Sequence, residues 1–200
     1  MIKTMDYLAK KLPDKVIIDG TELLINTDFR IWIEYSNLIL NDEIDIEYKI
    51  FKSIDLCYKD GIKILNYVDV ETAFDKIMWF FLCGKKEEKN TENKEKENPK
   101  PIYSFEEDWD YIYSAFYECY KIDLFDVNLH WWKFKSLFNS LSDKCQFSKI
   151  LGFRAMTINS KMSKEQKQYY RKMKRIYALK DNRSAEEKES AFARSLMSTM

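Results

Sequence analysis

The first 84 residues carry a short β-type pattern followed by helical patterns. Residues 16–18 and 23–25 are apolar runs on either side of Asp19-Gly20, a pair that favours a hairpin turn. Apolar positions then recur every three or four residues, which predicts one helix over about 28–40, a second that begins near Asp42 or Glu43, and a third from Asp69 to Gly84. The N-terminal part is therefore predicted to be a hairpin followed by three helices.

The same spacing predicts which side of each helix is buried. In the second helix, Lys49, Lys52 and Asp55 are expected to face solvent because they fall between the apolar positions. The expected buried stripes are Phe29, Ile33, Ser36 and Leu40 in the first helix, Ile46, Ile50, Ile54 and Cys57 in the second, and Val70, Phe74, Ile77 and Phe81 in the third.

A charged segment interrupts these patterns. Residues 85–101 contain six lysines, five glutamates, three asparagines and two prolines, and no apolar side chain. Nothing in the segment can offset the entropy cost of ordering its backbone, so we interpret it as a disordered or solvent-extended linker. A highly charged helix is the alternative, because Lys and Glu are good helix formers.

The strongest helical pattern follows this segment. Ser104 and Glu107 have the spacing of a capping box, and an apolar stripe begins directly after Ser104. Asp126 or Asn128 can cap a further helix over about 129–140. Shorter helical patterns follow at 147–153, after Ser163, which has the capping-box spacing with Gln166, and from about 184 to 200. The expected buried positions are Phe105, Trp109, Ile112, Phe116 and Tyr120; Trp131, Phe134, Phe138 and Leu141; and Tyr169, Met173, Ile176 and Tyr177.

These patterns predict a mainly α protein made of two small helical parts. The N-terminal part, residues 1–84, carries the hairpin, and the aromatic-rich part, residues 102–200, follows the charged linker 85–101. The formal net charge is zero, with ten basic and fifteen acidic groups in the first part and seventeen and thirteen in the second. This balance is far from that of a dedicated nucleic-acid domain. No signal peptide is expected, because charged residues interrupt the apolar positions of 1–11. No membrane span is expected, because the longest apolar run, 77–83, is too short.

Few residues offer candidate chemistry. His130 is the only histidine, and it could act as a general base or metal ligand. We favour a structural role instead, with the His130 side chain held within or beside an aromatic core. Cys119 or Cys145 with His130 lacks the surroundings of a nucleophile and its base. Carboxylates at 108, 110, 123 and 126 are assigned capping or surface roles, and the cysteines form no CxxC pair. The sequence therefore predicts a protein that is not an enzyme and needs no metal or cofactor.

A basic tract over 161–175 is the clearest feature outside the apolar stripes. Lys167, Arg171 and Lys174 interleave there with Tyr169 and Tyr170, a composition that suits phosphate contacts together with stacking. We favour a solvated helix face with inward tyrosines. An acidic protein partner and nucleic acid remain as alternatives.

The stretch 108–158 carries a resemblance to a known family. DWDYIYSAF, YKIDL, LHWWKFKSLFNSL and FSKILGFRAMTI follow one another there, and NTDFRIWIEY lies near the N-terminus. This order resembles a family of phage and prophage proteins named only as gene product fifteen, from long-tailed phages of low-GC Gram-positive bacteria. The similarity covers most of the chain, and the LHWWKF run makes it specific.

The resemblance implies a function in tail assembly. The gene of such proteins typically lies between those of the major tail protein and the tape-measure protein, which is the position of tail-assembly chaperones. We therefore expect a chaperone in the host cytoplasm that binds the tape-measure protein, with the major tail protein, a companion chaperone or a second copy as further partners, and that is absent from the finished virion. A nucleic-acid-binding regulator is the alternative. The expected partner-binding residues are Tyr111, Tyr113, Tyr117, Lys167, Arg171 and Lys174.

Overall fold

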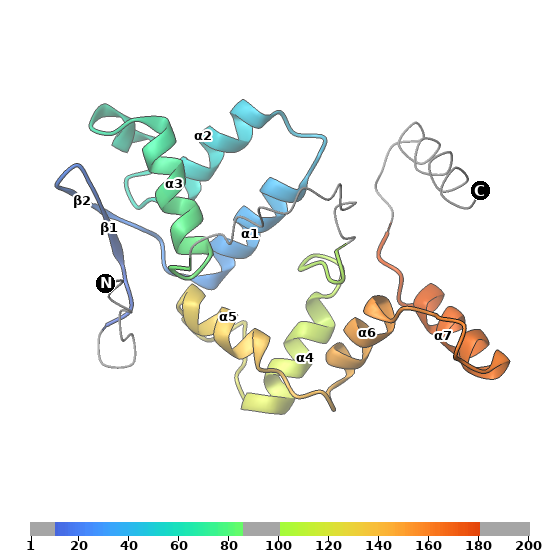
Figure 1. The fold of residues 1–200 in the computed structure, drawn as a ribbon. Coiled ribbons are helices and arrows are strands. Elements are labelled where there is room, and N and C mark those ends of the chain that lie inside the picture. The colour runs from blue at the N-terminus through green and yellow to red at the C-terminus, as the bar shows by residue number, and fades with distance from the viewer. Residues whose placement is uncertain (1–10, 86–100, 181–200) are drawn as a thin grey trace, which may run out of the picture.

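The computed structural model describes residues 11–85 and 101–180, and its fold is mainly helical (Figure 1). The hairpin is followed by three α-helices and a 3-10 helix in the N-terminal segment, and by four α-helices after residue 101. This confirms the predicted fold class, whereas most of the charged linker and the helix expected after residue 184 lie outside the described residues. The elements are β1 Lys15–Ile18, β2 Thr21–Leu24, α1 Phe29–Leu40, α2 Ile46–Cys57, η1 Gly61–Asn66, α3 Val70–Phe81, α4 Trp109–Tyr120, α5 Trp131–Asn139, α6 Gln146–Ala155 and α7 Lys164–Ile176.

The hairpin forms where the Asp-Gly pair predicts it. Strands β1 and β2 pair antiparallel with Ile18 opposite Thr21, so Asp19 and Gly20 make a two-residue turn. Both turn residues have positive φ, 48° and 82°, the conformation that matches the twist of a tight hairpin. Alternate side chains of the hairpin, including Val16 and Ile18, are buried in the core.

The three N-terminal helices begin at aspartates. Asp28 and Asp69 cap α1 and α3 by accepting from backbone N–H groups of the first turn. Helix α2 is capped by Asp45, so the expected start at Asp42 or Glu43 was wrong by one turn or less. The carboxylate of Asp45 accepts from the backbone N–H groups of Glu47 and Tyr48, the bonds expected of an N-cap aspartate.

Two predicted faces of these helices were wrong in part, although Phe29, Ser36, Ile54 and Cys57 are buried as predicted. The buried side of α1 is centred on Trp32 and Tyr35, while Leu40 at its end is 68% exposed. In α2, Lys49 is buried, and its ammonium donates to the carbonyl of Ile39 at 3.0 Å. Lys49 thus satisfies an unpaired carbonyl near the end of α1. This contact joins two helices, so the spacing of residues within one helix cannot predict it.

Helices α5 and α1 are joined at their N-termini. Trp131 donates its backbone N–H to Thr27, and Phe29 donates to Leu129, at 2.7 and 3.0 Å. His130 caps α5 by accepting from the N–H of Trp132 at its Nδ1 atom, so the expected caps, Asp126 and Asn128, were wrong.

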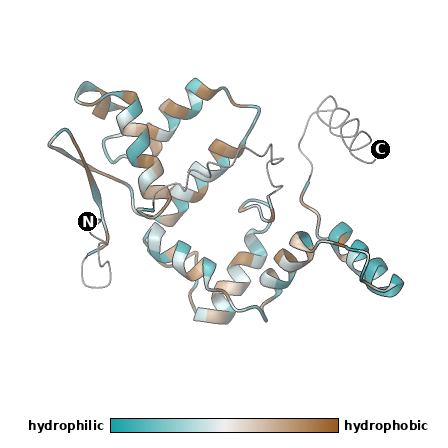
Figure 2. Ribbon diagram, viewed as in Figure 1, coloured by the Kyte–Doolittle hydropathy of each residue, from teal (hydrophilic) through white to brown (hydrophobic). Residues whose placement is uncertain are grey.

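One aromatic cluster connects the two segments that flank the charged region. Trp131 stacks on Phe81 and Phe29 stacks on Phe134, with distances between ring centroids of 5.4 and 4.8 Å. The indole N–H groups of Trp131 and Trp132 donate to the carbonyls of Phe81 and Phe80. Figure 2 shows that α7 is largely hydrophilic, in contrast to the mixed colouring of the helices before it. The division into separate parts at 85–101 stays a prediction.

A buried ion pair holds the start of α4. Asp108 is 1% exposed, and its carboxylate receives two hydrogen bonds from Arg154 at 2.6 and 2.9 Å. It also accepts from the backbone N–H of Ser104, the role that the expected capping box gave to Glu107. Only half of that box is formed, since the Ser104 hydroxyl accepts from the N–H of Glu107 at 3.3 Å, and α4 begins at Trp109 instead of Ser104. The buried pair also replaces the capping or surface role expected of Asp108.

The last described helix is attached to the fold through α6. The capping box of Ser163 and Gln166 is present as predicted. None of the residues of α7 is fully buried, and Figure 1 shows α6 lying between α7 and α4. Among the described residues, no helix is both long enough and apolar enough to cross a bilayer.

Candidate protein-binding site

Three aromatic residues of α4 stand on the outer side of the helix. Trp109, Tyr113 and Tyr117 follow one another at intervals of four, which places them along one face. Trp109 and Tyr117 are 57% and 51% exposed. The expectation that Trp109 lies in the buried stripe was therefore wrong, because the buried side of α4 is centred on Ile112, Ala115 and Phe116.

A loop residue completes this surface. Phe125 is 66% exposed, and its ring lies 5.0 Å from that of Tyr113 and 6.3 Å from that of Trp109. Tyr113 and Tyr117 are stacked at 6.3 Å. The four rings of Trp109, Tyr113, Tyr117 and Phe125 thus form a continuous surface, which we call the aromatic strip.

Arg30 fixes the loop that carries Phe125. Its guanidinium donates to the carbonyls of Leu124, Phe125 and Val127 at 2.7 to 3.0 Å. From the same loop, Asp123 accepts from the backbone N–H of Phe125 and from the hydroxyl of Tyr113. Partial desolvation and this second bond raise the pKa of Tyr113, so its phenol stays neutral. The exposed rings therefore stand on a braced backbone.

Acidic groups surround the aromatic strip. Asp110 and Glu118 are exposed on α4 beside it, and Asp126 is exposed on the loop next to Phe125. The basic residues of this region are Lys121, whose ammonium lies 5.9 Å from the ring of Tyr117, and Arg30, whose guanidinium binds the loop carbonyls. The site thus combines exposed rings with a rim that is mainly negative.

Of the three predicted tyrosines, the structure brings two together. Tyr113 and Tyr117 belong to the aromatic strip, whereas Tyr111 is half-buried against the core on another side of α4. Trp109 and Phe125 were missed as surface residues. The four-residue spacing of Trp109 with the two tyrosines was a readable signal, but no sequence signal marks Phe125.

The predicted basic residues of α7 do not form one group. Lys174 donates to the carbonyls of Arg154 and Met156 at 2.7 Å each, which neutralises the C-terminal end of α6. Lys167 donates to the carbonyl of Ser160 at 3.3 Å. Arg171 is exposed. Two of the three therefore hold the chain together, and one faces solvent.

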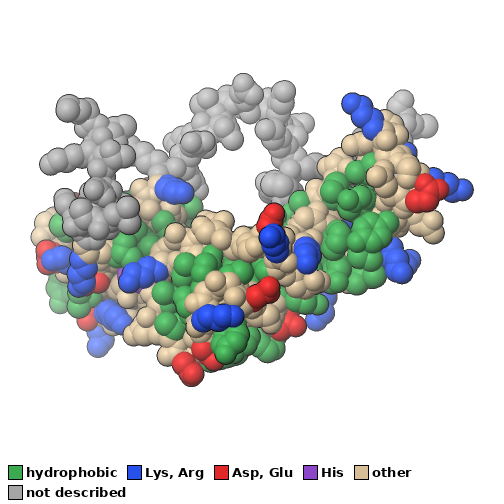
Figure 3. Space-filling view, turned by 90° about the horizontal axis from the view of Figure 1, so that it is seen from below, with side chains coloured by type: hydrophobic (Ala, Val, Ile, Leu, Met, Phe, Trp, Pro, Cys, Tyr) green, Lys and Arg blue, Asp and Glu red, His purple; other side chains and the backbone are tan. Residues whose placement is uncertain are grey.

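The face of the molecule in Figure 3 shows where apolar side chains reach the surface. Hydrophobic side chains gather in its middle and, on the right, over α6 and α7, with charged groups around both areas.

A phage family is matched by this chain over residues 8–179: its model is described as "Bacteriophage Gp15 protein". The chain belongs to this family. No curated protein and no solved structure matches the Gp15-family chain.

His130 has a structural role in this Gp15-family protein. Its Nδ1 atom accepts from Trp132, and its Nε2 atom lies 3.0 Å from the carbonyl of Pro13, to which it donates. Burial is the main cause that lowers the pKa of His130, and Lys133 acts in the same direction. Both ring nitrogens are engaged, so neither faces a substrate. Within 11–85 and 101–180, no group of three or more His, Cys, Asp or Glu residues could hold a metal ion.

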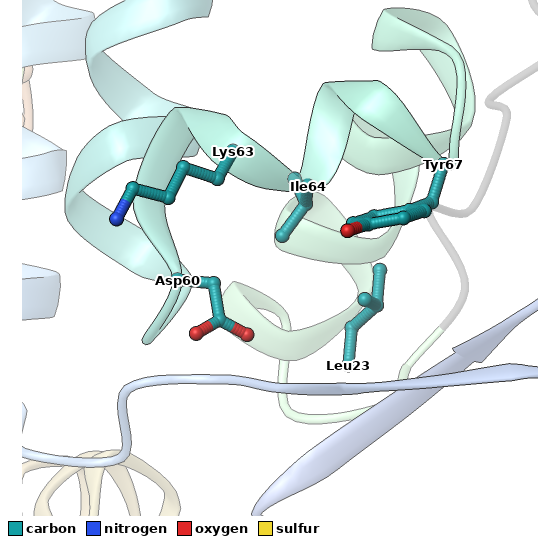
Figure 4. Close-up of a pocket in the computed structure, with 5 residues that line it drawn as sticks. All are labelled: Leu23, Asp60, Lys63, Ile64 and Tyr67. Atoms are coloured by element: carbon teal, nitrogen blue, oxygen red, sulfur yellow. The ribbon is translucent and has the colours of Figure 1, made fainter.

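A pocket lies on the opposite part of the fold, between the hairpin and η1. It has a volume of about 260 Å³ and is lined by Leu23, Asp60, Lys63, Ile64 and Tyr67 (Figure 4). Tyr67 is 74% exposed, and Asp60 and Lys63 are also exposed. The pocket is an open depression without converging polar groups, so the aromatic strip is the better candidate site in this Gp15-family chain.

Proposed function

We propose that this chain is a tail-assembly chaperone, a non-catalytic protein that holds the tape-measure protein of its phage while the tail tube is built. Membership of the Gp15 family supports the phage context. The aromatic strip carries the proposal, because four adjacent rings, three of them exposed and that of Tyr113 half-buried, form an apolar surface that a helical client can cover. The protein would act in the host cytoplasm and leave before the virion is finished.

The chemistry of the strip suits a client that must be released. Trp and Tyr give large contact areas and are common at the energetic centres of interfaces. The hydroxyl groups of Tyr113 and Tyr117 can also bind water when no client is present, which makes the strip compatible with an unbound protein in solution. A tape-measure chain, which is long and helical, presents apolar helix faces of the matching kind. The major tail protein and a companion chaperone are further proposed partners.

Nucleic-acid binding through α7 has less support. The ammonium groups of Lys167 and Lys174 are directed at backbone carbonyls, which makes them less available for phosphates. Such binding would weaken steeply with salt and would be lost when Arg171, Lys172 and Arg175 are neutralised.

The proposal is tested by co-expression with the tape-measure protein of the same genome, followed by pull-down and sizing. We expect the full chain to keep that protein soluble in a defined complex. Tyr117→Ser with Phe125→Ser should weaken the complex about ten-fold or more, since each ring removed is an exposed anchor at the centre of the contact.

Tyr48→Ser is the matched control, because Tyr48 is 58% exposed on α2, away from the strip. It should leave the complex unchanged. A wild-type chain that does not associate with the tape-measure protein at low or moderate salt would refute the chaperone function. A strip variant that binds as well as Tyr48→Ser would refute the site.

A further inference from the structure

Helix α7 presents an outer face that the described chain covers only at one edge, where the ring centroid of Tyr169 lies 6.1 Å from that of Phe153 on α6. Tyr169 and Ile176 are 50% and 54% exposed and lie two turns apart on one side of the helix. Lys172 lies between them and is exposed, as is Arg175 beside Ile176. Neither cation forms an ion pair with the residues in 11–85 and 101–180. The face therefore combines two apolar anchors with positive charge.

The aromatic strip has the complementary composition. Its rings are bordered by Asp110, Glu118 and Asp126, where the face of α7 has lysine and arginine. The lengths also agree: at 1.5 Å per residue, Trp109 to Tyr117 spans about 12 Å along α4, and Tyr169 to Ile176 spans about 10 Å along α7. Apolar anchors within an oppositely charged rim are the usual form of a helix-to-helix contact.

The two faces cannot meet within one chain. Arg154, on α6, donates to the carbonyl of Tyr177 at the end of α7 and simultaneously pairs with Asp108 at the start of α4. Lys174 ties α7 to the last carbonyls of α6 as well. Figure 1 shows the consequence, with α7 on the far side of α6 from α4. The complementary partner of each face is therefore on another molecule.

We propose that α7 of one copy docks on the aromatic strip of a second copy. The contact joins two different surfaces, so a pair of copies keeps one free strip, on the first copy, and one free α7, on the second. Such head-to-tail association continues into a closed ring or an open row of copies. This inference goes beyond the chaperone function and requires only the chain itself.

Charge reversal on each side provides the test. One full-length variant carries Glu118→Lys with Asp126→Lys, and the other carries Lys172→Glu with Arg175→Glu. No hydrogen bond within the described ranges uses these four side chains, so both variants should fold like the wild type, as circular dichroism and thermal unfolding will show. Association is measured by sedimentation over a wide concentration range at low salt.

We expect the wild type to associate and each variant alone to associate about ten-fold or more weakly, because like charges then meet at the rim. Mixing the two variants should restore association, since each strip then faces an α7 of opposite charge. The control, Asp42→Lys with Asp75→Lys, makes the same change in net charge as the strip variant, at exposed positions of the α1–α2 connection and of α3. It should associate like the wild type.

Three results would overturn the inference: a wild type that stays monomeric at every concentration, reversed variants that associate as the wild type does, or a mixture that fails to recover. The α7 variant separates this inference from the proposed function. It leaves the strip intact, so it should still bind the tape-measure protein while it no longer self-associates.

Discussion

Arg154 connects three parts of the C-terminal segment through one side chain. Its guanidinium donates to both carboxylate oxygens of Asp108, to the carbonyl of Ile102 and to the carbonyl of Tyr177. The carboxylate of Asp108 is almost fully buried, so it depends on this partner for charge compensation. At the residue scale, the planar guanidinium of Arg154 therefore links α4, α6 and α7 through several hydrogen bonds at once.

Replacing Arg154 should destabilise the fold strongly. Arg154→Ala is expected to lower the free energy of unfolding by about 3–5 kcal/mol, because it leaves a buried carboxylate unpaired. Urea unfolding measures the change. Arg171→Ala is the control, since Arg171 is exposed and should cost no more than about 0.5 kcal/mol. Equal effects of the two substitutions would contradict a structural role for the buried pair.

His130 should make stability depend on pH. Its pKa is lowered by burial, so the unfolded chain takes up the proton near pH 6.5, while the folded chain does so only at lower pH. The folded state is therefore at full stability above about pH 6.5 and loses stability as the pH falls through the lowered pKa, by about 1.4 kcal/mol per unit of pKa shift.

His130→Asn isolates this effect. Asparagine can still cap α5 with its side-chain oxygen, but it does not titrate. Unfolding free energies of the wild type and the variant, measured by urea at about pH 7.5 and 5.5, should fall more for the wild type. If both fall by the same amount, the loss comes from other groups.

At the scale of elements, local signals determined where most helices and the hairpin lie. The Asp19-Gly20 turn and the caps Asp28, Asp69 and Ser163 were all predicted, because each acts within a few residues of itself. The faces of the helices were harder to predict. Trp109 was expected to be buried and is exposed, and Lys49 was expected to be exposed and is buried, because partner helices decide which side of an amphipathic helix is covered.

Two glycines should respond in opposite directions to alanine. Gly20 has a φ of +82°, so Gly20→Ala should lower the unfolding free energy by about 1–2 kcal/mol through backbone strain alone. Gly152 lies within α6 with open space around it, so Gly152→Ala should raise that energy by about 0.5–1 kcal/mol. Thermal or urea unfolding gives both signs, and the same sign for both would contradict these backbone assignments.

At the scale of the whole molecule, the aromatic cluster makes the two segments interdependent. Trp131 is fully buried and packs on Trp32 and Phe81 of the N-terminal segment and on Phe134 of its own helix. Its indole also donates to the carbonyl of Phe81. The strip on α4 therefore stands on a scaffold to which residues before and after the charged segment both contribute.

Truncating Trp131 should weaken both segments together. Trp131→Ala is expected to cost about 3–5 kcal/mol, and amide exchange should accelerate in α1 and α3 as well as in α4 and α5. Trp109→Ala, at an exposed position of the strip, should cost less than about 1 kcal/mol. If exchange accelerates in the C-terminal segment alone, the cluster does not couple the two segments.

The sequence by itself determined the family, the helical class and the positions of most elements, because periodicity, turn pairs and caps act locally. Only the tertiary structure decided that His130 caps α5, that Asp108 and Arg154 form a buried pair, and that Trp109 and Phe125 join two tyrosines on one surface. Each of these involves contacts between residues distant in sequence: His130 with Pro13, Asp108 with Arg154, and Phe125 with Trp109 and Tyr113. Such contacts follow from packing between elements, which the pattern within any one element does not contain.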